Sequence, residues 1–175
     1  LEHLIRSGEG TTSYEAEEES VLILTSSLNA GGAERQVILT GAGLRNQGWK
    51  STIGVDRIDA QHSGETLQSM AESLDLNVIE FRDVNLQSDE ADELIRLHAN
   101  ILSNLRPIER ERSECIIRMI MNTRPRIIHA WQDAMIYPAA IANFIVGSNA
   151  LIGSVRSQNP DEKSLLHGRK RPFLR

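Results

Sequence analysis

The distribution of apolar and polar positions predicts alternating strands and helices from residue 21 onward. Short continuous apolar runs, typical of strands buried on both faces of a parallel sheet, occur at 21–26, 50–55, 77–81, 126–131 and 150–155. Between these runs, helical patterns cover 33–44, 64–74, 89–105, 108–122 and 134–146. Gly48 ends the first helix, and Pro107 interrupts the long helical pattern. The alternation predicts an α/β domain with an open sheet of parallel strands.

The two ends of the sequence differ from this ordered part, which we place at residues 20–156. Residues 1–19 show no sustained period and are rich in Glu, Ser, Thr and Gly, so we expect a flexible acidic leader. Residues 157–175 contain Pro160, a basic run and no further strand pattern. They read as a basic tail, and the strand-helix pattern stops there without a terminating element.

Composition and charge exclude several classes of protein. The chain has 175 residues, of which 40% are hydrophobic and only 4% aromatic, and its net charge is -5. Few aromatic rings and an acidic balance argue against a nucleic-acid partner. The single cysteine, Cys115, cannot form an internal disulfide and is expected to be a helix side chain. Residues 1–20 lack a secretory signal, and the weakly polar stretch 134–147 is shorter than the roughly 20 residues that span a bilayer. These observations predict a cytoplasmic protein.

The turn after the first strand is the strongest candidate site. In open parallel sheets, ligands bind outside the carboxyl ends of the strands, and a glycine turn that opens a helix directs backbone N–H groups at an anion. Gly31 and Gly32 stand at this point, where glycine permits close approach and a positive φ. We predict that they bind an anion; a plain strand-to-helix turn is the alternative. Glu34 and Arg35 follow in the first helical turn, where a local structural role is as plausible as ligand contact. The patterns G-x-G-x-x-G and G-x-x-x-x-G-K-[ST] are absent, which argues against NAD enzymes and P-loop proteins.

Three segments together resemble a known family. They are L-N-A-G-G-A-E-R-Q at 28–36, R-P-R-I-I-H-A-W-Q at 124–132 and A-L-I-G-S-V-R at 150–156. Their order and spacing are similar to those in the amino-terminal domain of GT-B-fold glycosyltransferases of the large family-four group. Arg126 departs from this pattern, in which Asp is commoner, and residues 83–106 are longer than the usual connection.

The resemblance implies a fold, a reaction and partners. It implies a Rossmann-like domain that forms one half of a GT-B architecture and mainly holds the acceptor. A carboxyl-terminal domain, which the basic tail would lead to and which has no counterpart in this chain, would bind the nucleotide. The intact enzyme would transfer a sugar, with retention, from a nucleotide diphosphate sugar to a glycan or lipid-linked acceptor, without a metal or another cofactor. This chain alone is expected to be inactive.

The resemblance also assigns roles to single residues. His129 is the candidate catalytic residue, placed to hydrogen-bond hydroxyls of the acceptor or the sugar; a satisfied core histidine is the alternative. Gly31 and Gly32 would offer backbone N–H groups to the donor's phosphates or to the sugar. Arg156 would hold a donor phosphate, unless it is a solvated loop arginine. Trp131 and Gln132 would contact the acceptor, although Trp131 suits a hydrophobic cap equally well. Asp133 is expected to be the N-cap of the next helix rather than a catalytic base.

Other interpretations stay open. Six arginines between 106 and 126, together with the basic tail, favour peripheral contact with anionic lipid at the inner membrane face, whereas Glu109, Glu111 and Glu114 favour an ordinary solvated face. A nucleotide-sugar epimerase of GT-B-like fold is the rival enzyme. A non-catalytic Rossmann-like binding module is the alternative of a different class.

Overall fold

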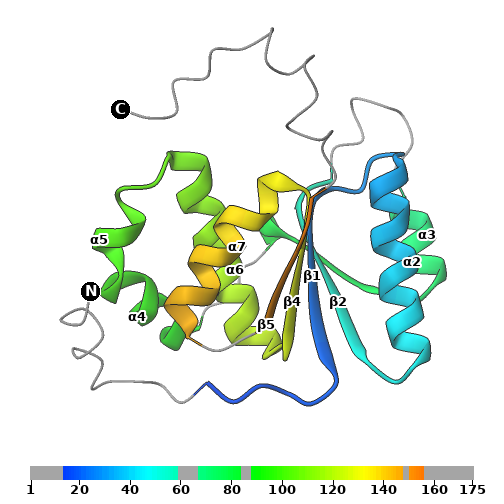
Figure 1. The fold of residues 1–175 in the computed structure, drawn as a ribbon, viewed down its shortest axis with the longest axis horizontal. Helices are drawn as coiled ribbons and strands as arrows, with labels where there is room; N and C mark the ends of the chain where they lie inside the picture. The colour runs from blue at the N-terminus through cyan, green and yellow to red at the C-terminus, as the bar shows by residue number, and fades with distance from the viewer. Residues whose placement is uncertain (1–13, 59–66, 84–87, 148–149, 156–175) are drawn as a thin grey trace, which may run out of the picture.

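The computed structural model describes residues 14–58, 67–83, 88–147 and 150–155, and it confirms the predicted fold class. Five strands form one parallel sheet in the order β3-β2-β1-β4-β5 (Figure 1). The strands are β1 (Ser20–Ser27), β2 (Lys50–Arg57), β3 (Asn77–Glu80), β4 (Ile127–Trp131) and β5 (Ala150–Ser154). Each lies within two residues of its predicted bounds. The result is a Rossmann-like α/β sheet.

Helices cover the two faces of the sheet in separate groups (Figure 1). One face carries α2 (Gly32–Asn46) and α3 (Gln68–Ser73). The other carries α4 (Asp89–Leu97), α5 (Ala99–Leu102), α6 (Pro107–Thr123) and α7 (Asp133–Val146). From β1 the chain proceeds outward through β2 to β3, then crosses back to β4 and β5 on the other side of β1. This reversal, combined with crossovers of one hand, puts the later helices on the opposite face.

The region between β3 and β4 differs most from the prediction. The single helical pattern over 89–105 is divided into α4 and α5 at His98. Both the backbone N–H and the ring Nδ1 of His98 lie 3.0 Å from the carbonyl oxygen of Leu94, so this residue closes α4. Pro107 is the first residue of α6, where its missing N–H costs no hydrogen bond. Helix α3 begins at Gln68, and residues 64–66 of the predicted helix lie outside the described residues.

Alternate residues of β1 supply the two halves of the core. Leu22 and Leu24 pack with α6 and α7, whereas Val21 and Ile23 pack with α2 and α3. All four are at least 96% buried. A strand buried on both faces needs the continuous apolar run that identified it in the sequence. Strand β1 is therefore the rigid centre from which the neighbouring loops emerge.

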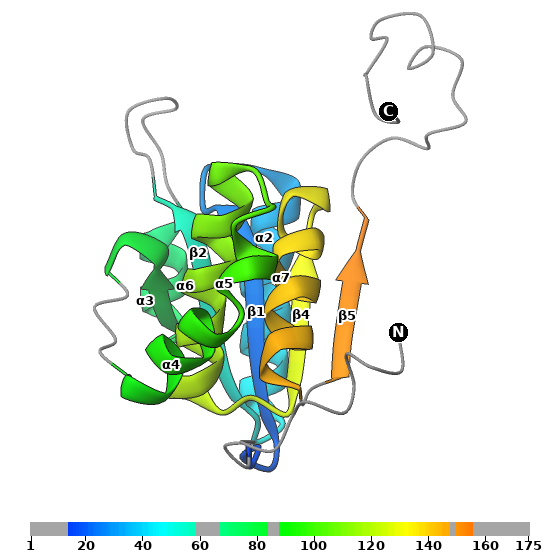
Figure 2. The ribbon, with the colours of Figure 1, turned by 90° about the vertical axis from the view of Figure 1, so that its left-hand side faces the viewer.

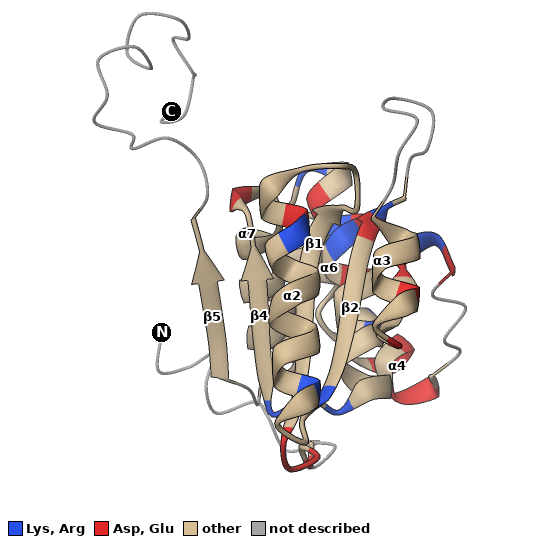
Figure 3. Cartoon of the chain, turned by 90° about the vertical axis from the view of Figure 1, so that its right-hand side faces the viewer, with Lys and Arg blue, Asp and Glu red and all other residues tan. Residues whose placement is uncertain are grey.

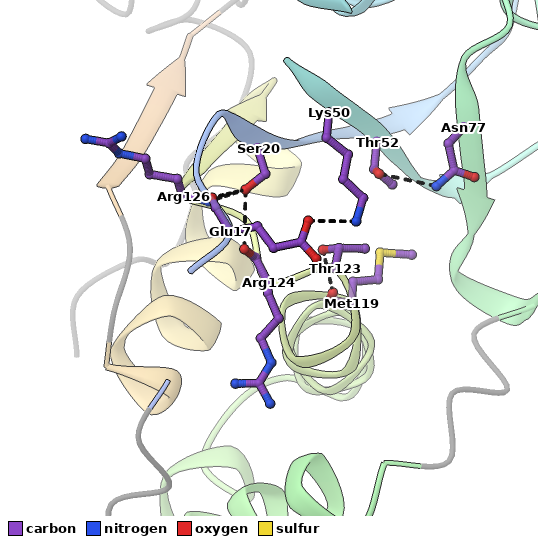
Figure 4. A network of polar contacts seen from close by, with 9 residues as sticks. All are labelled: Glu17, Ser20, Lys50, Thr52, Asn77, Met119, Thr123, Arg124 and Arg126. Carbon is purple, nitrogen blue, oxygen red and sulfur yellow. Dashed lines mark hydrogen bonds and ion pairs between the residues drawn. The ribbon is translucent and has the colours of Figure 1, made fainter. Parts of the chain in front are cut away.

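The amino-terminal edge of the sheet is tied together by polar contacts (Figure 4). The Ser20 hydroxyl donates to the carbonyl of Glu17 at 2.6 Å and accepts from the backbone N–H of Arg126 at 2.9 Å. Glu17 also pairs with Lys50 at 2.7 Å, and the Tyr14 hydroxyl donates to the carbonyl of Pro125 at 2.7 Å. Residues 14–19 are thus held against the sheet by hydrogen bonds and an ion pair, although we expected them to be part of the flexible leader. Residues 1–13 of that leader and the tail 157–175 lie outside the described residues.

No helix in the described part of the chain is long and apolar enough to cross a membrane.

Candidate functional site

The reversal of strand order occurs between β1 and β4, where open α/β sheets bind ligands. Because β1 and β4 are parallel, the helices that follow them, α2 and α7, both begin at the carboxyl ends of the strands. Helix α2 lies on one face of the sheet and α7 on the other. Strand β5, parallel to β4, ends at this edge too, at Ser154. The first two of the three resembling segments, 28–36 and 124–132, are nearly 100 residues apart in sequence, and the fold brings their loops together here.

The glycine loop has a different backbone from the one we predicted. Gly31 is the N-cap of α2 with φ -142° and ψ 162°, which is extended backbone, and Gly32 is the first helical residue. Among the described glycines, positive φ occurs at Gly48 and Gly147, so the expected positive φ at this loop is wrong. A Cβ on Gly31 would collide with a carboxylate oxygen of Glu34 and lie 3.1 Å from its Cδ. A Cβ on Gly32 would have no neighbour within 4 Å. Gly31 therefore makes room for Glu34, and Gly32 leaves open space at the start of the helix.

Glu34 connects this loop to the loop after β4. Its Oε1 accepts a hydrogen bond from Gln132 Nε2 at 3.0 Å and lies 3.4 Å from the Ser27 hydroxyl. The Ser26 hydroxyl donates to Gln132 Oε1. A hydroxyl, a carboxamide and a carboxylate thus form one chain of hydrogen bonds across the switch point, which we call the switch-point network (Ser26, Ser27, Glu34 and Gln132).

Gln132 holds an unusual backbone conformation in this network. Its φ of 70° and ψ of 149° lie where non-glycine residues are rare and strained. The backbone N–H of Gln132 donates to the carbonyl of Ser154 at 3.0 Å, and the residue is the N-cap of α7. Asp133, which we predicted as N-cap, is instead the first residue of that helix. The strained backbone aims the Gln132 side chain back toward β1 and Glu34.

His129 and Trp131 lie on the same face of β4, on the side of the sheet that carries α2. His129 is half-buried, its Nε2 is 2.8 Å from the Ser154 hydroxyl, and its ring centre is 5.1 Å from that of Trp131. The β4 register places it level with Ile23, inside the strand rather than in the loop. Trp131 is only 4% exposed and packs in the core between the sheet and α2, which leaves no ring face for stacking on a sugar. The ring occupies the position of a hydrophobic cap.

The charge in this loop favours some ligands over others. The Glu34 carboxylate lies in the first turn of α2, where it interacts favourably with the positive end of the helix dipole. An anionic ligand at Gly31 would meet this carboxylate, whereas a hydroxyl group can donate to it. The side chains that form hydrogen bonds at this point are hydroxyls, a carboxylate, a carboxamide and an imidazole, which suit a hydroxyl-rich ligand; the exposed Arg35 follows Glu34 in the same helical turn.

Two other predictions concern arginines, namely Arg156 and the six arginines between 106 and 126. Arg156 lies outside the described residues. Five of the six arginines between 106 and 126 form ion pairs, with Glu109, Glu114, Asp56, Asp92 and Glu90 as their partners. This pairing weakens the observation on which the lipid alternative rested. Within the described ranges, no group of three His, Cys, Asp or Glu side chains is arranged to hold a metal ion.

A cavity of about 250 Å³ lies away from these residues, at the carboxyl ends of β2 and β3. Its walls include Asp56, Glu80, Phe81 and Cys115. Burial raises the pKa of the Cys115 thiol from 9.0 to about 11, so the residue is a protonated helix side chain at neutral pH. Asp56 is held by Arg112 through Nε at 3.1 Å and Nη2 at 2.5 Å. None of the residues predicted from the motifs lines this cavity.

Sequence reasoning overlooked Ser26 and Ser154, which contact Gln132 and His129. A serine at the last or next-to-last position of a parallel strand is the signal that could have identified them. Comparison of the chain with models of known protein families found no match, and comparison with curated proteins found none either.

Proposed function

We propose that this chain is the amino-terminal, acceptor-side domain of a glycosyltransferase that moves a sugar from a nucleotide diphosphate sugar to a glycan or lipid-linked acceptor. One observation carries the proposal. Two of the three sequence segments that resemble the family, 28–36 and 124–132, meet at the topological switch point through the hydrogen bond between Glu34 and Gln132. Residues that only shaped their own local turns would not need this contact across the sheet.

The chemistry of the switch-point network supports a sugar as the bound group. Sugar hydroxyls both donate and accept, and they would find a carboxylate acceptor on Glu34 and an amide with both functions on Gln132. Gly32 leaves open space beside the first backbone N–H groups of α2. His129, bound to Ser154, contributes from within β4 in this proposal by fixing the β5 side of the site rather than by direct attack on substrate.

The two tryptophans provide a direct binding assay. Trp131 borders the site, whereas Trp49 immediately precedes β2 at the opposite edge of the sheet. In a two-dimensional ¹⁵N NMR titration of the full chain with monosaccharides, disaccharides and UDP-glucose, we expect saccharide-dependent shifts of the Trp131 indole and the Gln132 amides, with the Trp49 indole unchanged.

The control is a glycine substitution. Gln132→Gly removes the carboxamide while glycine tolerates the positive φ, so the backbone is retained. We expect this variant to lose the shifts. Asp75→Gly changes another positive-φ residue, far from the site, and should keep them. The absence of saccharide-dependent shifts across the panel, or equal shifts in Gln132→Gly, would argue for a structural turn and against the proposed function.

A further inference from the structure

The cavity at the carboxyl ends of β2 and β3 is separate from the switch-point network but lies only one strand away from it. The register of β1 and β2 pairs Ser27 with Arg57, so the preceding residues are level on adjacent strands; these are Ser26 and Asp56. Ser26 continues the alternate residues of β1 that pack with α6 and α7, and it therefore points to the same face as Asp56, which contacts Arg112 of α6. Adjacent strands are about 4.8 Å apart, so one ligand of modest size can reach both side chains.

Helix α6 lies over β2 on this face of the sheet and forms one wall of the cavity (Figure 2). Its Ile108 and Cys115, together with Phe81 after β3, make this part of the lining apolar, and the Cys115 thiol is protonated at neutral pH. The volume of about 250 Å³ is slightly below the roughly 300 to 1,000 Å³ of pockets for drug-sized ligands. The cavity therefore suits a smaller group, such as one sugar ring.

The carboxylates in the cavity are neutralised by arginines. Acidic and basic residues lie side by side at the carboxyl end of β2 (Figure 3). Asp56 accepts hydrogen bonds from Arg112 Nε at 3.1 Å and Nη2 at 2.5 Å. The Glu80 side chain is only 4% exposed, pairs with Arg82 at 2.9 Å and accepts the backbone N–H of Ile58 at 3.0 Å. A charged ligand would have to break one of these pairs and leave a charge without its partner, so a neutral ligand is favoured.

Two polar groups of the cavity keep hydrogen-bonding capacity that the described residues do not use. Both contacts from Arg112 go to Oδ2 of Asp56, which leaves Oδ1 as an acceptor. Arg57 is exposed at the end of β2 and forms no ion pair within the described residues, so its guanidinium N–H groups are available as donors. Hydroxyl groups both donate and accept, and the CH groups of a sugar ring suit the apolar wall. A neutral, hydroxyl-rich ring therefore matches this cavity best.

We propose that the cavity binds a second sugar unit of the acceptor, next to the unit at the switch-point network, so that the acceptor is a saccharide of at least two units. Asp56 joins the two positions, because it lines the cavity and is level with Ser26 on the adjacent strand. The inference rests on the proposed function and narrows its substrate class, since a monosaccharide would fill only one of the two positions.

An NMR titration of the full chain follows both positions at once. Labelled isoleucine methyl groups report on Ile108 in the cavity, and the side-chain amide of Gln132 reports on the switch-point network. Ile127, at the start of β4 on the opposite edge of the sheet, is the reference methyl group. The ligands are monosaccharides with their disaccharides, such as glucose with maltose and cellobiose, and mannose with mannobiose. We expect a disaccharide to shift Ile108 and Gln132 with one dissociation constant, at least fivefold lower than that of its monosaccharide.

Two arginine variants test the cavity itself. Arg57→Ala removes the available donor and leaves the residues of the switch-point network in place, so the dissociation constant of the disaccharide should rise at least threefold while that of the monosaccharide stays the same. Arg126→Ala is the matched control, because Arg126 is also exposed and has no ion pair within the described residues, but lies at the opposite edge of the sheet. This variant should bind both sugars like the parent chain.

The possible outcomes separate this inference from the proposed function. Shifts confined to Gln132, with equal affinities for monosaccharide and disaccharide, would overturn the inference and leave the proposed function standing. Different dissociation constants at Ile108 and Gln132 would indicate two separate ligands and would also overturn it, as would an unchanged disaccharide affinity in Arg57→Ala. The absence of a shift at Gln132 with every sugar would count against the proposed function itself, and the inference would fail with it.

Discussion

The Gly31→Ala substitution tests the central contact of the candidate site. A methyl group at Gly31 would collide with the Glu34 carboxylate, whereas the backbone at Gly31 is extended and accepts alanine without strain. The substitution therefore acts through Glu34, which has to move away. The colliding atom is Oε2, and we expect its displacement to shift Oε1 as well, with loss of the 3.0 Å hydrogen bond from Gln132 and of the longer one from Ser27.

The expected cost follows from the lost hydrogen bonds. A hydrogen bond to a charged group contributes about 1.5 to 3 kcal/mol, and this one is partly exposed, so we expect Gly31→Ala to lower the free energy of unfolding by about 1 to 2 kcal/mol. Gly32→Ala should leave it unchanged or raise it slightly, because its methyl group meets nothing within 4 Å and alanine is the better helix former by up to about 1 kcal/mol. Alanine should thus lower the free energy of unfolding at Gly31 but not at the adjacent Gly32.

A double-mutant cycle in urea denaturation isolates the mechanism. In a Glu34→Ala background the added methyl group has nothing to displace, so Gly31→Ala should cost almost nothing there. An undiminished cost in that background would refute the reasoning, because the strain would then lie in the backbone. If the proposed function is correct, Gly32→Ala should also weaken saccharide binding while the fold keeps its stability.

Further predictions concern the core, the amino-terminal edge and the thiol. Gly54→Ala should destabilise the fold by about 1 to 3 kcal/mol, because its methyl group would lie 2.8 Å from Leu24 and from Met119, whereas Gly43→Ala on the exposed side of α2 should not; urea midpoints of the two variants provide the comparison. Tyr14→Phe should cost about 1 kcal/mol, a loss of about 2 to 4 °C in thermal midpoint, through the hydrogen bond to Pro125. Burial raises the pKa of Cys115 from 9.0 to about 11 in the folded chain, so the unfolded chain loses this proton at lower pH and the free energy of unfolding should fall as pH rises from 9 through 11. Alkylation of the native chain should stay slow below that range. Cys115→Ala should remove this part of the pH dependence.

The sequence predicted the strands better than the loops for a physical reason. A strand buried on both faces requires an apolar run, so β1 and β4 were visible as Val21–Ser26 and as part of 126–131. The division of the long helix at His98 was not visible, because it depends on one side chain reaching the carbonyl of Leu94. The binding of residues 14–19 was missed as well, since backbone and hydroxyl hydrogen bonds leave no period in the sequence.

The meeting of the loops after β1 and β4 could be predicted from the sequence, whereas the contacts between their side chains could not. Parallel topology alone brings the loops after β1 and β4 to one edge, which is why Gly31 and Gln132 could be named in advance. The contact between Ser26 and Gln132 joins residues 106 positions apart and depends on a strained φ that no pattern reveals. Trp131 is buried because it joins the core cluster that β1, β2 and α2 form on one side of the sheet, and a tryptophan at the end of a strand gives no sign of which neighbour covers it.

The position of Glu34 changes what the glycine motif means. A glycine turn at a helix N-terminus usually indicates an anion site, but here the chain supplies its own anion, held by Gln132 and given room by Gly31. A phosphate would have to displace this carboxylate, at the cost of its hydrogen bonds and with repulsion between like charges. A hydroxyl group needs no displacement because it donates to the carboxylate where it lies. The segment G-G-A-E therefore acts as one unit in which the first glycine positions the acid and the second leaves the space beside it open, and under the proposed function that space receives a sugar hydroxyl.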